Sequence, residues 1–444
     1  MANGIEKGTI GNFPFFPLEF DKNAQPVDPA QMDSLRQFLD SGEAPSDLFV
    51  VSHGWNNDEA EAMALYRNLF GHIGGLLDGG AVAGLGGRRF AIAGVFWPSK
   101  KFADRDLIAG GAAAAEDAAD VGLAATVNRL RAFLGDPASD AALTQAQQLL
   151  PQIGQPAAQR QFLALLKSLP VSIQGDAEDQ PKELASDSHA DLFDRLASPI
   201  FVPEEDPDAG GAASLDLTAG GDVGLGDVLD GAKGAAQRLL NLFTYYGMKE
   251  RAGIVGVTGL NPFLAGLRAA HPRLRLHLMG HSFGGRLVTA AVNGPAQFQP
   301  STLTLLQAAF SHFGFASKYD GRNDGAFRAV VSAGKVQGPL LVTRSRQDVA
   351  VGVAYAVASR VAGQIAAAIG DANDRFGGIG RNGALATPEA ANRDLLQPGA
   401  GRYDFSGGAR VFNLNGDAII TSHGDVARPE TAFAALSAVA AATV

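Results

Sequence analysis

A glycine–X–serine–X–glycine pattern at residues 280–284 constrains this chain more than any other feature. The stretch Gly280-His281-Ser282-Phe283-Gly284 follows an apolar-alternating run that predicts a strand, and it precedes a run over 286–292 with helical spacing. A serine between a strand and a helix lies on a very tight turn, where larger residues in place of the two glycines would collide with neighbouring backbone. The pattern therefore predicts that Ser282 is a nucleophile exposed above the sheet edge, and an accidental glycine-rich turn is the alternative.

Buried strands and amphipathic helices alternate around this motif. Apolar runs at 47–52 and 90–97 predict two buried strands, separated by a helix over 58–77 and preceded by one over 30–39. Further strands are expected at 303–309, 339–343 and 409–414, and helices at 349–369 and 429–443. This alternation predicts an α/β fold with a mostly parallel, doubly wound sheet.

About 170 residues separate the strand that ends near Trp97 from the strand that leads to the motif. Apolar residues recur with helical spacing over 109–134, 141–169 and 231–270. The stretch 171–230, in contrast, holds fifteen acidic and two basic residues with interspersed proline and glycine. Such a composition predicts exposed loops, and no Asp-x-Asp-x-Asp-Gly pattern supports the alternative of a calcium loop. We interpret 101–260 as a mainly helical cap inserted between two parts of one core, 1–100 and 261–444.

Composition excludes several classes of function. The chain of 444 residues has no cysteine, which excludes disulfides, thiolate nucleophiles and cysteine metal ligands. Its net charge of −10 argues against binding to a nucleic-acid backbone. No signal core precedes the first strand and no apolar run approaches membrane-spanning length, so we expect a cytoplasmic enzyme without stable membrane insertion. Export by a route that reads no N-terminal signal stays open.

The motif with its following Gly285 resembles the nucleophile elbow of α/β-hydrolases, in particular of their lipase and esterase members. The similarity extends to His53-Gly54-Trp55-Asn56, to Asp348 and to Ser422-His423-Gly424-Asp425. It implies an α/β-hydrolase fold with a largely helical cap insertion and a catalytic triad in the chain order serine, acid, histidine.

The resemblance implies that His423 is the catalytic base, because it follows the last expected strand in a polar loop. The other histidine after Ser282, His312, comes too early for an acid to lie between it and the serine, and we expect it to pack or to line a pocket. Asp348 is expected to be the acid, with a plain helix N-cap as its alternative role. Asp417 and Asp425 are rivals because they lie close to His423 in the sequence.

The same resemblance assigns the oxyanion hole to the backbone N–H groups of Trp55 and Phe283. His53, Gly54 and His281 are expected to contribute to substrate binding, with His53 also supporting its loop through a side-chain hydrogen bond. His53 has no second ligand at metal spacing, and we expect neither a metal nor another cofactor.

The expected function is hydrolysis of carboxylic esters, from small molecules or lipids, through an acyl-enzyme. A peptidase or amidase with the same triad, an acyltransferase, and a binding module on an inactive scaffold are the alternatives. The sequence leaves the oligomeric state open. It also leaves open why Arg273, Arg275 and His277 alternate with leucines on a strand expected to be buried: either this half protrudes from the sheet, or acidic groups of the insertion pair with it.

Overall fold

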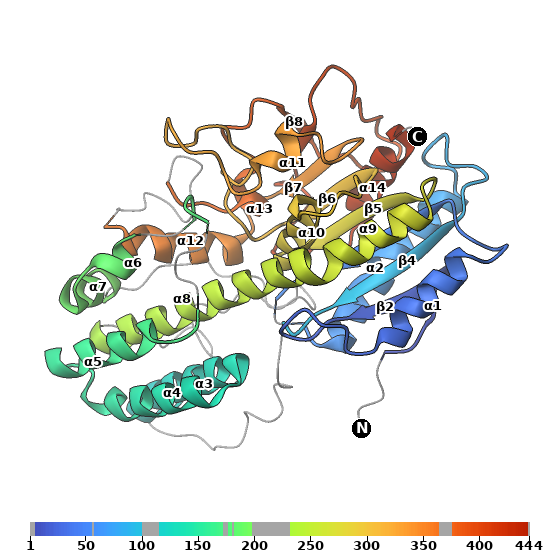
Figure 1. Ribbon diagram of the computed structural model, residues 1–444. Coiled ribbons are helices and arrows are strands. Elements are labelled where there is room, and N and C mark those ends of the chain that lie inside the picture. Colours follow the sequence, from blue (N-terminus) through green and yellow to red (C-terminus); the bar gives the residue numbers. More distant parts are fainter. Residues whose placement is uncertain are drawn as a thin grey trace.

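The sheet at the centre of the molecule is mostly parallel. A computed structural model describes residues 5–55, 57–99, 115–171, 176–179, 182–197, 231–363 and 375–442. In this part of the chain nine strands form one sheet in the order β1-β2-β4-β3-β5-β6-β7-β9-β8, with only β1 antiparallel to its neighbour (Figure 1). The strands are β1 (Gly8–Ile10), β2 (Phe13–Glu19), β3 (Asp47–Ser52), β4 (Phe90–Phe96), β5 (Arg275–His281), β6 (Thr302–Leu306), β7 (Leu340–Arg344), β8 (Ala390–Asp394) and β9 (Val411–Asn415).

Helices connect the parallel strands, and a large group of them lies between β4 and β5. The helices are α1 (Pro29–Leu39), α2 (Glu59–Asp78), α3 (Ala115–Leu134), α4 (Pro137–Leu149), the 3₁₀ turn η2 (Leu150–Gln152), α5 (Pro156–Lys167), α6 (Glu183–Ser186), α7 (His189–Leu196), α8 (Gly231–Ile254), the π-helical turn η3 (Val255–Leu260), α9 (Asn261–Ala270), α10 (Phe283–Asn293), α11 (Arg328–Ser332), α12 (Val349–Val361), α13 (Ile379–Asn382) and α14 (Pro429–Ala441).

Both faces of the sheet are buried, and the period-2 alternation of its strands decides which residue faces which layer. In β3, Leu48 and Val50 belong to the apolar cluster that includes Leu35 of α1 and Leu287 of α10. Phe49 and Val51 belong to the opposite cluster, which contains residues of α2 and α14. The arrangement is α/β with helices on both sides of a parallel sheet, as in doubly wound folds.

The chain leaves the sheet after β4, forms α3 to α9 and returns at β5. Figure 1 shows α3, α4, α5 and α7 gathered beyond the sheet, with α8 running from this group toward it. One continuous helical path joins α8, η3 and α9, and it lies close to α10 because Gly256 has no side chain: a Cβ there would lie 2.3 Å from the Leu287 carbonyl oxygen. The insertion and one face of the sheet share a single apolar cluster. The division into core parts 1–100 and 261–444 and a cap 101–260 remains an interpretation.

Most expected strands occur where the sequence places them, and β3 has the expected bounds. Three strands were not expected. In β2, Pro14 and Pro17 interrupt an aromatic run, and proline argues against a strand because it cannot donate to the ladder. β1 has only three residues, and β8 is a largely exposed polar strand at the sheet edge without an apolar pattern.

The acidic stretch 171–230 is not uniformly exposed, and this part of the expectation is wrong. Glu178 and Asp179 are 3% and 1% exposed, and α7 buries Leu192, Phe193 and Leu196. Asp179 can be buried because Lys249 of α8 pairs with it, and Arg286 of α10 pairs with the neighbouring Asp176. Glu178 instead accepts from the Ala326 N–H. Residues 198–230 lie outside the described residues, as do 109–114 of the helix expected over 109–134. The helix expected over 349–369 ends at Val361, and residues 364–369 also lie outside.

Arg273 is exposed in the turn before β5, outside the strand. Arg275 and His277 of β5 face a carboxylate of the neighbouring strand, so acidic groups of the insertion do not explain them. His277 Nε2 lies 2.9 Å from Oδ1 of Asp47 on β3, and Arg275 lies 3.7 Å from the other oxygen. Arg88 forms a further ion pair with Asp47. Burial opposes ionisation of Asp47, but the hydrogen bonds from His277, Arg88 and Ser46 outweigh it and hold the pKa of Asp47 well below its usual range.

Candidate active site

Ser282 lies on a strained turn between β5 and α10. Its φ of 55° and ψ of −126° place a non-glycine residue in a sparsely populated conformation. Backbone hydrogen bonds hold it there: its N–H donates to the Leu306 carbonyl at 3.1 Å, and its own carbonyl accepts from Ala309 N–H at 3.0 Å. The sheet and the following loop therefore fix the direction of the Ser282 side chain.

The glycines on both sides of Ser282 are sterically required. A Cβ on Gly280 would lie 2.3 Å from the Gly284 carbonyl oxygen, and one on Gly284 would lie 2.3 Å from the carbonyl oxygens of Ser52 and His53. Real Cβ atoms do not approach backbone so closely, so the spacing of the motif follows directly from backbone packing.

Three residues from distant parts of the chain form a hydrogen-bonded line. Ser282 Oγ lies 2.9 Å from His423 Nε2, and His423 Nδ1 lies 2.9 Å from Asp348 Oδ2. Asp348 is the N-cap of α12, and its other oxygen accepts from Val351 N–H at 3.0 Å. A carboxylate only accepts, so it places the imidazole proton on Nδ1 and leaves Nε2 free to accept from the serine hydroxyl.

The rival residues make other contacts. Asp417 binds the backbone N–H and the guanidinium of Arg346, whereas Asp425 binds Thr421 and Arg428. His312 is buried beside Asn382, and burial lowers the pKa of His312 to about 3. Asp348 is thus the acid that the fold brings to His423, and it is an N-cap at the same time.

The three side chains are enclosed. Ser282, Asp348 and His423 are 1%, 0% and 3% exposed. The expectation that Ser282 is exposed above the sheet edge is therefore wrong for this conformation, because loops and aromatic side chains pack over that edge. Phe283 contacts Trp55 and Tyr245, with ring centroids 6.0 and 5.1 Å apart. Tyr245 belongs to α8, so a helix of the insertion packs directly against the residue that follows Ser282.

The loop after β3 lies against Ser282. A Cβ on Gly54 would lie 2.7 Å from Ser282 Cβ, which shows how closely the loop backbone approaches the serine. His53 supports this loop: its Nδ1 donates to the Gly54 carbonyl at 2.9 Å, and its Nε2 accepts from Trp97 N–H at 3.3 Å. Burial lowers the pKa of His53 to about 4. Both ring nitrogens are used within the protein, so the expected loop support is present and neither nitrogen is left for a substrate.

His281 lies between the same loop and the loop of His423. Its Nε2 donates to the His423 carbonyl at 3.0 Å, and the two imidazole centroids are 4.9 Å apart. The sequence placed His281 among the substrate-binding residues. It did not indicate this contact, which joins residues 142 positions apart.

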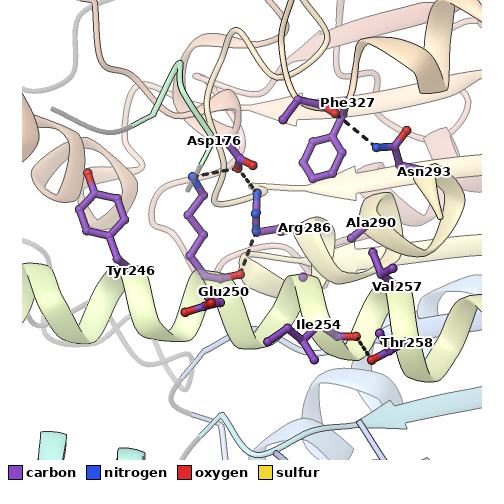
Figure 2. Close-up of a pocket in the computed structure, with 13 residues that line it drawn as sticks. Asp176, Tyr246, Glu250, Ile254, Val257, Thr258, Arg286, Ala290, Asn293 and Phe327 are labelled. Carbon is purple, nitrogen blue, oxygen red and sulfur yellow. Dashed lines mark hydrogen bonds and ion pairs between the residues drawn. The ribbon is translucent and has the colours of Figure 1, made fainter. Parts of the chain in front are cut away.

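An ionic cluster next to α10 was also missed. Asp176 accepts from Arg286 Nη1 at 2.5 Å and pairs with Lys249 at 3.1 Å, and Lys249 also binds Asp179. Figure 2 shows the pairs of Asp176 at one side of a hollow of about 370 Å³ between α8 and α10. Ile254 and Val257, which line this hollow, are 39% and 36% exposed. Two features of the sequence could have indicated this ionic cluster: the acidic run 176–179 and the single charge, Arg286, in the otherwise uncharged stretch 286–292. Only the fold brings these residues together.

No group of three or more histidine or acidic side chains suited to a metal ion occurs within the described ranges. No helix in the same parts of the chain is long and apolar enough to cross a membrane. Comparisons of the chain with protein-family models, with curated proteins and with solved structures find no match.

Proposed function

We propose that the protein is a serine hydrolase with an α/β-hydrolase fold that cleaves carboxylic esters through an acyl-enzyme. The observation that carries the proposal is the hydrogen-bonded line Ser282–His423–Asp348 on a strained strand–turn–helix elbow. Neither part alone is specific, but a nucleophile, a base and an orienting acid in one line form the arrangement that activates a serine.

In the proposed reaction, Ser282 Oγ attacks the ester carbonyl carbon while His423 Nε2 takes the hydroxyl proton. Asp348 stabilises the imidazolium that forms and keeps the ring in its orientation. His423 then donates the proton to the leaving alcohol oxygen as the carbon–oxygen bond breaks. A water molecule, deprotonated by His423, attacks the acyl-enzyme and releases the acid and free Ser282.

We assign the stabilisation of the developing oxyanion to the backbone N–H groups of Phe283 and Trp55, which would donate hydrogen bonds to it. Phe283 is the first residue of α10, where an N–H has no partner within the helix and the helix dipole favours negative charge. Trp55 follows Gly54, whose backbone lies against Ser282. Two such donors are each worth about 3 kcal/mol of transition-state stabilisation.

A fluorophosphonate probe tests the nucleophile. We expect it to label the wild-type protein covalently at Ser282, as located by peptide mass spectrometry, and to leave Ser282→Ala unlabelled. Ser437→Ala is the matched control, because that hydroxyl only donates to the Phe433 carbonyl on α14 and its loss should leave labelling unchanged. Equal labelling of the wild type and Ser282→Ala would refute the proposal. Hydrolysis of p-nitrophenyl esters of graded chain length then defines the acyl group.

Acyl transfer to an alcohol is the second candidate, and the burial of Ser282 favours it. A nucleophile that is 1% exposed is shielded from bulk water, so a bound alcohol could intercept the acyl-enzyme before water does. Product analysis with an added alcohol separates the two reactions: a transferase forms the new ester in preference to the free acid, whereas a hydrolase forms the acid.

A further inference from the structure

We propose that His281 is a positioning residue that holds the main chain of the catalytic base through its hydrogen bond to the His423 carbonyl. This inference rests on the proposed function of Ser282 and His423, and it replaces the expectation that His281 binds substrate. His281 ends β5 directly before Ser282, so a strand at the centre of the sheet fixes its backbone.

The contact has a defined direction. A carbonyl oxygen only accepts, so the proton of His281 lies on Nε2, 3.0 Å from the His423 oxygen. Burial, together with the neighbouring imidazole of His423, lowers the pKa of His281 to about 3. His281 therefore stays neutral across the pH range in which a serine hydrolase works, and its hydrogen bond does not change with the protonation of His423.

His423 needs such support because it lies in a loop between β9 and α14 without regular secondary structure. Its side chain is held at both nitrogens, but a ring can keep its place only if the backbone that carries it is also held. Among the described residues, the main chain of His423 has one hydrogen-bond partner, and this partner is Nε2 of His281. Loss of this bond would let the loop, and with it the base, shift relative to Ser282.

The other side of the His281 ring faces the loop after β3. Nδ1 is buried without a hydrogen-bond partner, and a Cβ on Gly54 would lie only 3.0 Å from it. The ring therefore lies between the loop of the base and the loop assigned to the oxyanion hole. Because Nδ1 is buried in this structure, it is not accessible to a substrate group, which argues against the substrate-binding role.

A pair of isosteric substitutions tests the proposal. Glutamine can place its amide nitrogen near the position of Nε2 and donate, whereas methionine has a similar length and no donor. We expect His281→Met to lower kcat for p-nitrophenyl ester hydrolysis by about ten- to a hundredfold with KM changed less than threefold, because a small displacement of a reacting group costs about that much. His281→Gln should retain kcat within about fivefold of the wild type.

Three outcomes would overturn the proposal. Wild-type kcat in His281→Met would show that the bond does not matter. A raised KM with unchanged kcat would point to substrate binding instead. Equal losses of kcat and of thermal stability in both variants would indicate only a packing role.

A measurement without substrate keeps this test separate from the proposed function. In ¹⁵N-histidine-labelled protein, the proton between His423 Nδ1 and Asp348 should give a downfield resonance, which Asp348→Asn assigns by removing it. We expect this resonance to persist in His281→Gln and to broaden or vanish in His281→Met. An unchanged resonance in His281→Met would contradict the inference about His281, whatever the activity of the wild type. If the wild type neither hydrolyses esters nor reacts with the fluorophosphonate, that result would refute the proposed function alone.

Discussion

Single residues around Ser282 act through size as much as through chemistry. Gly280 and Gly284 permit the turn, and Gly54 lets a second loop reach the serine. Ser282 itself carries the backbone strain, and two backbone hydrogen bonds hold it there, one donated to the Leu306 carbonyl and one accepted from the Ala309 N–H. The hydrogen-bonding groups and the absent side chains together place Ser282 Oγ 2.9 Å from His423 Nε2.

The triad should behave as one unit. We expect Ser282→Ala and His423→Ala each to lower kcat for ester hydrolysis by roughly 10⁶, and Asp348→Asn by somewhat less, because each removes the same activated nucleophile. The double mutant Ser282→Ala/His423→Ala should be scarcely worse than either single mutant. Steady-state kinetics with an active p-nitrophenyl ester measures this, and multiplicative losses in the double mutant would contradict a shared mechanism.

Gly54→Ala should impair catalysis without unfolding the protein. The added methyl group would lie 2.7 Å from Ser282 Cβ and 3.0 Å from His281 Nδ1, so the loop must move away from the serine. We expect kcat to fall by about ten- to a hundredfold. Gly71→Ala in α2 is the matched control: nothing lies within 4 Å of its Cβ, and alanine favours a helix by about 1 kcal/mol. If both variants keep wild-type kcat, the loop does not help to shape the site.

At the scale of elements, the pairing of β3 with β5 buries a charge at the amino-terminal ends of these two strands. Asp47 pairs in register with Arg275, and its carboxylate reaches His277 and Arg88. His277 also contacts Thr302 Oγ1 of β6 at 2.9 Å through its other nitrogen. Three adjacent strands are thus joined by one buried polar network, and removing a single member would leave buried charges or hydrogen-bonding groups without their partner.

Asp47→Ala should strongly destabilise the fold. It leaves His277 and Arg88 in place without their carboxylate, and breaking a buried charge network typically costs about 3–5 kcal/mol. Denaturant unfolding measures the free energy of unfolding. Asp33→Ala, which removes an exposed pair with Arg36, should change it by less than about 1 kcal/mol. Similar effects of the two substitutions would show that the buried network contributes little.

At the scale of the whole molecule, the insertion is joined to the sheet by apolar and by ionic contacts. Apolar residues of α3, α5, α7 and α8 belong to the same cluster as those of α10 and the sheet. The short segment 176–179 pairs with Lys249 on α8 and Arg286 on α10, and Glu178 accepts from Ala326 N–H at 2.9 Å. These contacts connect the insertion to α10, the helix that begins directly after Ser282.

Glu178 should make the stability of the protein depend on pH. Burial and the nearby charges of Asp176 and Asp179 raise its pKa from 4.5 to about 7. Between these values the folded state binds more protons than the unfolded state, so this group's contribution to stability falls as pH rises through that window. Above pH 7 the ionised Glu178 costs about 3 kcal/mol relative to an unshifted group.

Glu178→Gln should remove this dependence, since the amide oxygen can still accept from Ala326 and carries no charge. We expect the variant to be more stable than the wild type at pH 8 and little different at pH 5, as measured by thermal or denaturant unfolding across that range. A stability difference that stays constant from pH 5 to pH 8 would contradict a titrating Glu178.

Local patterns were enough to predict much of the fold and the candidate site. The apolar runs of β3, β4 and β5 and the strand–turn–helix around Ser282 depend on neighbours within a few residues, so their periodicity and glycine spacing are legible in the chain itself. The selection of Asp348 and His423 also came from the sequence, although it used the resemblance to α/β-hydrolases rather than local physics. β2 and β8 were not predicted. The prolines of β2 and the polar residues of β8 mask the alternation of apolar and polar residues on which strand prediction depends.

Only the tertiary structure decided which of these groups meet. Asp348, rather than Asp417 or Asp425, contacts His423 from 75 residues away, and His281 reaches the His423 carbonyl across 142 positions. Asp47 is the partner of His277, and the cations of α8 and α10 allow acidic residues of 176–179 to be buried where composition predicted exposure. The physical reason is common to these cases: composition and period report how a segment prefers to fold, whereas the cost of burying a charge depends on the partners that strand order and loop paths bring to it.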